Sequence, residues 1–110
     1  MQSTGIVQFI REKLNKTQFY STTVNGSRIV ACFGVDTYGE LTKYMQVKHK
    51  ADVGILINTA DKSVKMIHFT QNTFNFNKFA NILELKAVKN IATGLINNKI
   101  VEFTKRLIVC

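Results

Sequence analysis

The sequence predicts an α/β or α+β domain in which about three helices pack on one mixed β-sheet that contains two β-hairpins. Three observations predict it: short β-branched and aromatic runs, segments of helical periodicity between them, and an Asn-Gly pair that joins two of the runs. The chain has 110 residues, 45% of them apolar, and it contains no proline. We therefore expect one compact domain over residues 1–110, with the approximate element order α-β-β-α-β-β-α-β-β and a short final edge strand.

A helix is predicted at the start of the chain, from Thr4 to Asn15. Ser3 or Thr4 can cap this helix through its side-chain oxygen. Apolar residues then recur every three or four positions between Ile6 and Leu14, which is the spacing of one helical face.

A β-hairpin is predicted next, with strands over Phe19–Val24 and Ser27–Phe33. Asn25-Gly26 joins the two strands and favours a type I′ turn, because both central residues of that turn need a positive φ. The apolar run Ile29–Phe33 indicates a buried central strand, which Gly34 ends.

The second predicted helix begins at a capping box formed by Thr37 and Glu40, and it should end near Lys48-His49-Lys50. Two strands follow. The first is the short apolar run Asp52–Asn58, and the second is Ser63–Thr70, where apolar and polar residues alternate. A turn over residues 59–62 connects them.

The third predicted helix follows an irregular segment over Gln71–Phe76. Asn75 or Asn77 can cap this helix, which should extend through Leu83. The residues from Glu84 to Gly94 are then interpreted as a loop, since Gly94 is expected to interrupt regular structure.

The C-terminal part is predicted as strands. Leu95-Ile96 and Lys99–Phe103 should form the second hairpin around the turn Asn97-Asn98, and Leu107–Val109 should be a final edge strand. An exposed edge strand at this place would let two copies pair as a homodimer.

The charge of the chain is strongly basic. Fifteen Lys and Arg face seven Asp and Glu, which gives a net charge of +8, and the cations are spread from Arg11 to Arg106 without a basic tail. Such a balance favours nucleic acid, an acidic protein surface or anionic lipid as a partner. The alternative is that the lysines only keep the protein in solution.

The cysteines and the apolar runs indicate the cellular compartment of the protein. Cys32 lies in an apolar run and should be a buried hydrophobe, while Cys110 is the last residue, so a disulfide between them is not expected. No leader-like segment and no apolar run of about 20 residues is visible. We expect a cytoplasmic protein in a reducing compartment, without membrane contact.

Catalytic and metal-binding patterns are absent from the sequence. His49 and His68 are the only histidines, and neither pairs with a cysteine or histidine at metal-ligand spacing. The seven acids are single residues, and no nucleophile motif or phosphate loop occurs. His49 is interpreted as a solvated residue at a helix end and His68 as a strand residue. We therefore expect no metal, no cofactor and no catalytic residues.

An aromatic stretch is the remaining feature of chemical interest. Phe69, Phe74, Phe76 and Phe79 alternate with asparagines and with Lys78. Exposed phenylalanines here could stack on nucleic-acid bases. Buried ones would belong to the core, and burial is the favoured interpretation for most of them.

The segment order over residues 28–103 resembles the C-terminal DHH-associated domain of the DHH phosphoesterases, which also ends alanyl-tRNA synthetases. The short helix at Tyr38–Met45, the strand at Ala51–Ile57 and the helix entry at Phe74–Ala80 carry the resemblance. Val88–Gly94 is similar to the family's His-Lys-Asn-Ala-Ala-Gly. The resemblance implies the fold and a degenerate binding face rather than an enzyme, because the catalytic DHH domain is absent.

The chain departs from that family in the glycine run, which is replaced by Glu84–Ala87, and in the histidine, which is replaced by Val88. The family's hairpin arginine has no counterpart, since His68 and Phe69 stand there. Only Lys89 and Asn90 carry over by position as ligand-binding residues. Lys86 adds a cation to the same segment.

Three hypotheses on function follow. The first is a non-catalytic module that binds nucleic acid or a nucleotide through a basic face. The second is a protein–protein interaction module, such as a phage- or virus-encoded inhibitor or accessory subunit, that docks on an acidic partner surface. The third is an enzyme with an unfamiliar site around His68 and Cys32. For the first, the predicted nucleic-acid-binding residues are Lys78, Lys86, Lys89, Asn90 and His68.

Overall fold

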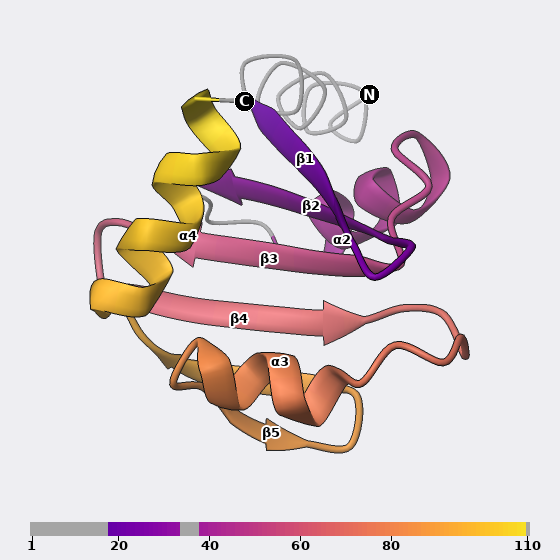
Figure 1. Ribbon diagram of the computed structural model, residues 1–110. Helices are drawn as coiled ribbons and strands as arrows, with labels where there is room; N and C mark the ends of the chain where they lie inside the picture. Colours follow the sequence, from indigo (N-terminus) through magenta and orange to yellow (C-terminus); the bar gives the residue numbers. More distant parts are fainter. Residues whose placement is uncertain (1–17, 34–37, 110) are drawn as a thin grey trace, which may run out of the picture.

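The computed structural model describes residues 18–33 and 38–109, which form a six-stranded mixed sheet with helices on both faces (Figure 1). The strand order is β1-β2-β3-β4-β6-β5. This architecture confirms the predicted α/β or α+β class, and three helices lie within the described ranges. The elements are β1 (Phe19–Val24), β2 (Ser27–Phe33), α2 (Tyr38–Val47), β3 (Val53–Asn58), β4 (Ser63–His68), α3 (Phe76–Ile82), β5 (Lys86–Val88), β6 (Ile91–Leu95) and α4 (Asn98–Val109).

The β1–β2 hairpin forms where the sequence predicts it. Val24 pairs with Ser27 across the turn, and Phe19 pairs with Cys32 at the other end. Asn25 and Gly26 have φ values of 51° and 82°, as a type I′ turn requires.

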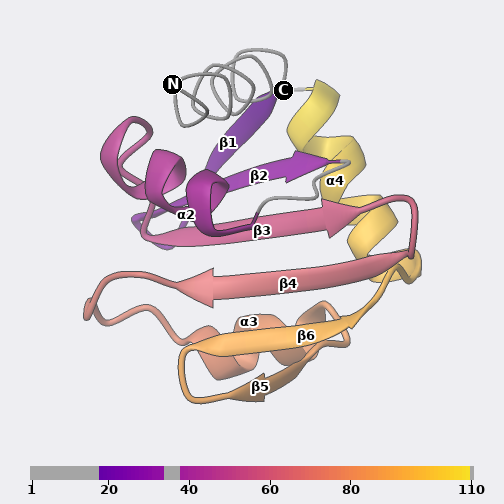
Figure 2. The same cartoon turned by 180° about the vertical axis from the view of Figure 1, so that it is seen from behind.

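One face of the sheet is covered by α2, which connects β2 to its parallel neighbour β3 (Figure 2). Leu41 and Met45 of α2 are buried against Val30, Cys32 and Leu56 of the two strands. This helix therefore covers the half of the sheet that contains β2 and β3. Its predicted C-terminal end is confirmed, because α2 ends at Val47, just before the three basic residues.

The opposite face is covered by α3 and α4, which lie in front of the sheet in Figure 1. The larger core cluster lies here and joins strand residues to both helices. Its buried members include Ile29, Ile55 and Met66 from the strands, Phe79 from α3 and Ile100 from α4.

The segment after α3 differs from the prediction. Residues 84–94 are not a loop, because β5 and β6 form an antiparallel hairpin with Val88 paired to Ile91. Gly94 lies inside β6 rather than at a break. A Cβ atom on Gly94 would lie 2.8 Å from Cδ2 of Leu85, so the glycine makes room for that buried side chain.

The C-terminal prediction was wrong. Residues 98–109 form the helix α4, so the chain has neither the hairpin around Asn97-Asn98 nor the edge strand Leu107–Val109. Asn97 caps the helix, since its Oδ1 accepts a hydrogen bond of 2.9 Å from the Ile100 amide. The homodimer edge expected at this place is therefore lost, and the sheet edges are β1 and β5.

Some predictions fall outside the described residues. These are the helix Thr4–Asn15, the break at Gly34, the capping box that begins at Thr37, and Cys110. In the described ranges, no helix combines the length and the apolar character that a membrane span requires.

Candidate functional site

Three adjoining pockets form one open groove on the face of the sheet that carries α3 and α4. Their volumes are about 220, 350 and 250 Å³, and Val24 lines all three. Phe79 and Ile82 are shared by the first two pockets, and Phe103 and Arg106 by the last two. We call this feature the α3–α4 groove.

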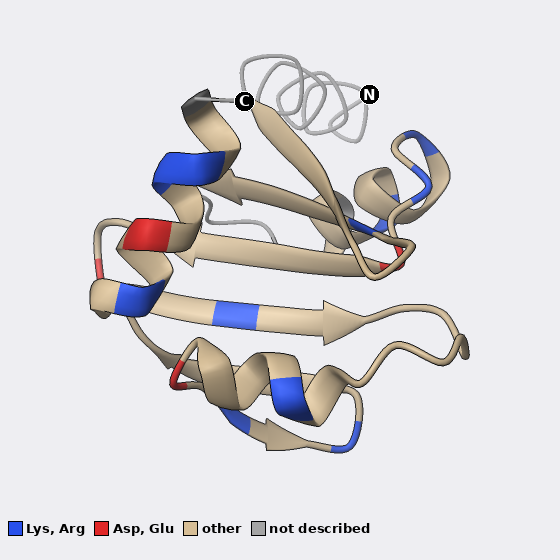
Figure 3. Ribbon diagram, viewed as in Figure 1, with Lys and Arg blue, Asp and Glu red and all other residues tan. Residues whose placement is uncertain are grey.

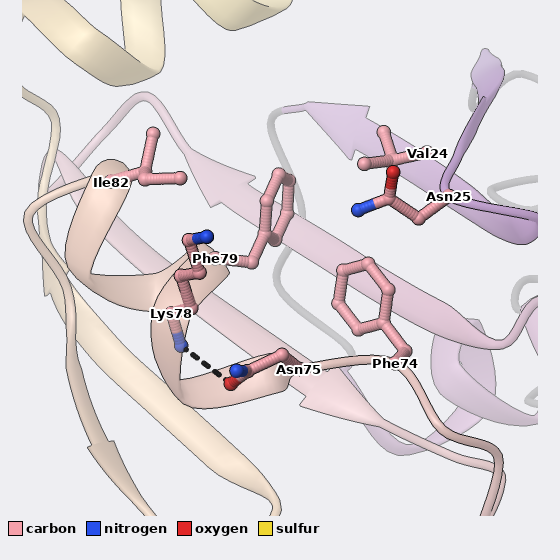
Figure 4. A pocket seen from close by; sticks show the side chains of 7 residues that line it. All are labelled: Val24, Asn25, Phe74, Asn75, Lys78, Phe79 and Ile82. Atoms are coloured by element: carbon pink, nitrogen blue, oxygen red, sulfur yellow. Dashed lines mark hydrogen bonds between the residues drawn. The ribbon is translucent and has the colours of Figure 1, made fainter.

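The first part of the groove lies between the β1–β2 turn and α3 (Figure 4). Val24 and Asn25 from the turn lie across from Phe74 and Phe79. Asn75 caps α3, as predicted, because its Oδ1 accepts a hydrogen bond of 3.1 Å from the Lys78 amide. That cap sets where the first turn of α3 begins and so places Lys78 beside the pocket.

A row of aromatic rings follows the groove. Each ring lies edge-on to the next in the order His68, Phe74, Phe79 and Phe103. The distances between successive ring centroids are 5.8, 5.4 and 5.5 Å. Edge-to-face contacts at these distances stabilise the packing of the rings and hold each ring in a defined orientation. The aromatic row thus joins β4, the following loop, α3 and α4.

His68 is held firmly at one end of the aromatic row. Its ring stacks on Phe76 at 5.4 Å, with 14° between the planes. Its Nε2 lies 2.8 Å from Oδ1 of Asn72, and Asn72 donates through Nδ2 to Oγ of Ser27 at 2.9 Å. Since that Oδ1 atom only accepts, Nε2 of His68 carries the hydrogen.

Cations dominate the charged groups along the groove. The lining residues include Lys78 of α3 and Lys99 and Arg106 of α4, against one carboxylate, Glu102. The three α4 residues are spaced at i, i+3 and i+7, which places them on one side of the helix. Figure 3 shows the corresponding blue and red bands on α3 and α4.

The structure separates the residues that the sequence grouped as a binding site. Lys78 lines the groove, and Asn90 lies beside His68, whose amide donates to the Asn90 carbonyl at 2.9 Å. Lys89 occupies the β5–β6 turn with a φ of 58°. Lys86, however, lies on the other face of the sheet, because its strand neighbour Ala87 packs against the α3–α4 core.

Sequence reasoning missed Lys99, Phe103 and Arg106, because their segment was interpreted as strands. The helical spacing of Ile100, Phe103 and Leu107 was the signal that could have found them. The favoured burial of the aromatic stretch is confirmed for Phe76 and Phe79, while Phe69 and Phe74 are partly exposed.

Two other chemically interesting residues, Cys32 and His49, lie in packed surroundings. Burial raises the pKa of Cys32 to about 12, so this thiol is not ionised at neutral pH. His49 is not simply solvated, because its ring centroid lies 4.7 Å from that of Phe19 and 5.4 Å from that of Tyr44. Within the described ranges, no three His, Cys, Asp or Glu residues lie close enough together to hold a metal ion.

Comparison with known proteins shows similarity at the level of the fold. No family model and no curated protein matches the chain. A solved structure of an uncharacterized protein from Helicobacter pylori G27 is similar, with 12% sequence identity and a TM-score of 0.56. The similarity covers 79% of this chain but 27% of that one, so the chain spans about a quarter of that protein's length.

Proposed function

We propose that this protein is a non-catalytic module that binds single-stranded nucleic acid in the α3–α4 groove. The observation that carries the proposal is the aromatic row along the groove, flanked by Lys78, Lys99 and Arg106. Single-strand-binding proteins combine these two features, a cationic groove for the backbone and aromatic rings for the bases.

The aromatic rings supply the contacts for bases. Phe74 and Phe103 are partly exposed and line the groove, so each can offer part of a ring to a base. Phe79 is 8% exposed and lies between them, where it contacts both rings edge-on. Because every base has a π-face, such contacts favour single strands without selecting a sequence.

The cations supply the contacts for phosphates. Lys99 and Arg106 are seven residues apart on α4, which corresponds to about 10 Å along the helix axis. Cations at this separation can each contact a different phosphate of one strand. Lysine is a point charge that suits phosphate attraction more than base readout, which again favours binding with little sequence preference.

The DHH-associated resemblance agrees with a binding role without catalysis, but it is a separate prediction. The positions that it implies, Lys89 and Asn90, lie in the turn beside His68, at the end of the aromatic row. A single strand of nucleic acid bound in the groove would reach this turn if it continued past His68. Lys86 is not part of this proposal, because it lies on the other face of the sheet.

The test is a fluorescence-anisotropy titration of nuclease-treated protein with short labelled single-stranded DNA and RNA, and with the matching duplexes, at low and at physiological salt. We expect single strands to bind more tightly than duplexes, and affinity to fall as salt rises. Phe74→Leu keeps an apolar side chain but removes the ring, and it should weaken binding by roughly fivefold or more.

The matched control for the groove cations is Lys43, an exposed lysine of α2 on the opposite face of the sheet. Lys78→Gln and Arg106→Gln should each weaken binding, whereas Lys43→Gln should not. Equal effects of all three substitutions, or affinity that does not change with salt, would contradict the proposal.

A further inference from the structure

Within residues 18–33 and 38–109, one half of the sheet has no helix over it on the face that carries α2. That helix covers β2 and β3, and its core cluster reaches Ile67 of β4. Figure 2 shows no labelled helix in front of β4, β6 and β5 on this side. The same three strands are covered by α3 and α4 on their other face. A sheet face of this kind usually buries its apolar residues against a second layer. We call it the open face.

The open face carries a row of apolar side chains at aligned positions. Ile67 of β4 pairs with Ile91 of β6, and Ile91 pairs with Val88 of β5, so the three side chains lie on one side of the sheet. Val88 is 62% exposed. Leu95, on the same face but separated from the row by Thr93, is 67% exposed. Large apolar residues in adjacent positions of well-paired strands indicate a contact surface.

The exposure does not come from frayed strands. On the other face, Met66 pairs with Ala92 and Ala92 pairs with Ala87, and the first two of these residues are fully buried. Within the described residues, the strands are therefore well packed on one side and largely exposed on the other. The exposed apolar residues belong to an ordered surface that a partner could contact without rearrangement.

The charge of the open face selects the kind of partner. Lys65, Thr93 and Lys86 pair in register across β4, β6 and β5, next to the apolar row. The three strands contain these two lysines and no Asp or Glu. Lys89 adds a third cation in the adjoining turn. The apolar row Ile67–Ile91–Val88 is thus flanked by Lys65 and Lys86 along the strands and by Lys89 in the turn, while Leu95 lies beyond the lysines. An apolar row flanked by cations is complementary to an apolar surface flanked by carboxylates.

Other occupants fit less well. A second copy of this face would bring lysines against lysines. The strands β4, β6 and β5 offer nucleic acid only aliphatic side chains on this face, because their one ring, His68, packs on the other face. Phe69, which follows β4, packs against the α2 cluster. The chain's own residues 1–17 carry Arg11, Lys13 and Lys16 against the single acid Glu12, so their charge does not complement the face.

We propose that the open face docks an acidic, amphipathic protein surface, such as a helix that presents apolar residues flanked by Asp and Glu. The apolar row would supply the buried area, and Lys86 and Lys89 would orient the partner through its carboxylates. The apolar row and the α3–α4 groove lie on opposite faces of the sheet, so the two proposals share only Lys89, in the turn at the end of both surfaces.

The experiment uses two designed amphipathic helical peptides and the full chain labelled with ¹⁵N. The first peptide has a Leu face flanked by Glu, and the second replaces every Glu by Lys. We expect the Glu peptide to shift the amide resonances of β5, β6 and the turn at Lys89, and to bind at least several times more tightly than the Lys peptide. Shifts centred on α3 and α4, equal affinity for both peptides, or no binding at the highest soluble concentration would overturn the proposal.

Variants locate the contact. Val88→Thr combined with Leu95→Thr keeps residues that favour strands but removes apolar surface, and it should weaken Glu-peptide binding by roughly tenfold. Lys86→Gln should weaken it as well. The matched controls are Val47→Thr, at an apolar residue 79% exposed on α2, and Lys43→Gln. Controls that weaken binding as much as the open-face variants would overturn the proposal.

Two further outcomes identify a different occupant. Sedimentation of the free protein should show a monomer, and a dimer that Val88→Thr/Leu95→Thr dissociates would assign the face to a second copy. Labelled single-stranded DNA should not compete with the Glu peptide. If the DNA displaced the Glu peptide, and did so equally well in the variants Lys78→Gln and Arg106→Gln, the open face would be assigned to nucleic acid.

Discussion

Gly54 of β3 lies against Met45 of α2 and the ring of Phe69. A Cβ atom built on it would lie 2.7 Å from Sδ of Met45 and 2.7 Å from Cε2 of Phe69. Met45 is fully buried, so its side chain has little space into which it could move. Even a methyl group at this position must therefore displace both the Met45 side chain and the Phe69 ring.

We predict that Gly54→Ala lowers the free energy of unfolding by about 1–3 kcal/mol, the usual effect of an overpacked core. The control is Gly39→Ala in α2, where a Cβ atom would meet nothing within 4 Å. Because alanine favours helices more than glycine, the control should raise stability by up to about 1 kcal/mol. Urea denaturation measures both, and a neutral Gly54→Ala would contradict the packing argument.

His49 makes the stability of the fold depend on pH. Burial lowers the pKa of His49 below its ordinary 6.5, and the neighbouring cations Arg28 and Lys48 lower it further. The unfolded chain then takes up a proton at a higher pH than the folded chain does. The free energy of unfolding should therefore fall as pH drops from 6.5 through the lowered pKa of the folded state.

We predict that His49→Asn makes stability less dependent on pH in that range. Thermal unfolding at a series of pH values compares the variant with the wild type, and the difference between the two curves isolates His49 from other titrating groups. If the difference in stability between variant and wild type does not change between neutral pH and about pH 5, folding does not disfavour the protonated form of His49, and the prediction is wrong.

At the scale of secondary-structure elements, local chemistry explains both the accurate and the wrong predictions. Asn25-Gly26 was predicted correctly because a type I′ turn needs two positive φ values, which few other pairs accept. Asn97-Asn98 carries the same side-chain chemistry, but an asparagine can close a hairpin or cap a helix equally well. The helical spacing of the apolar residues after Asn97, rather than the asparagines, decides between the two structures.

The cap of α4 also ties the helix to the rest of the fold. Asn97 accepts from the Ile100 amide through Oδ1, and it donates through Nδ2 to the carbonyls of Leu83 and Leu95, at 2.9 and 3.3 Å. A single side chain therefore connects the end of α3, the end of β6 and the start of α4. Loss of that side chain leaves a helix amide and a part-buried carbonyl without these partners.

We predict that Asn97→Ala lowers the free energy of unfolding by about 1–2 kcal/mol. Asn97→Asp keeps the oxygen that caps α4 but loses the donor, so its effect should be smaller than that of alanine. Asn98→Ala, at the exposed neighbouring position, is the control and should be nearly neutral. Chemical denaturation monitored by circular dichroism ranks the three variants, and equal effects at positions 97 and 98 would contradict the capping role.

At the scale of the whole molecule, the sheet divides the basic residues between two surfaces. Lys86 and Lys89 are three positions apart and were predicted as one site, yet Lys86 lies on the open face and Lys89 in a turn at its end. Lys78 and Arg106 are far apart in the sequence, yet they flank one groove because α3 and α4 pack on the same face. Net charge predicts attraction to polyanions, but only the packing of the helices determines which cations act together.

That division sets the salt dependence of nucleic-acid binding. If Lys78, Lys99 and Arg106 each neutralise one phosphate, the logarithm of the association constant should fall with the logarithm of salt concentration with a slope of about −2 for single strands. Removing one of them, as in Arg106→Gln, should reduce the slope by about 0.7. Lys43→Gln removes an equal charge on the opposite face and should leave the slope unchanged.

Glu102 provides the opposite test in the same titrations. It is the one carboxylate among the residues that line the α3–α4 groove, so it repels a phosphate backbone there. Glu102→Gln should therefore tighten binding at low salt, and the gain should shrink as salt screens the charge. If the net charge of +8 attracted nucleic acid diffusely, Lys43→Gln and Arg106→Gln would change the slope equally, and binding would not be located in the groove.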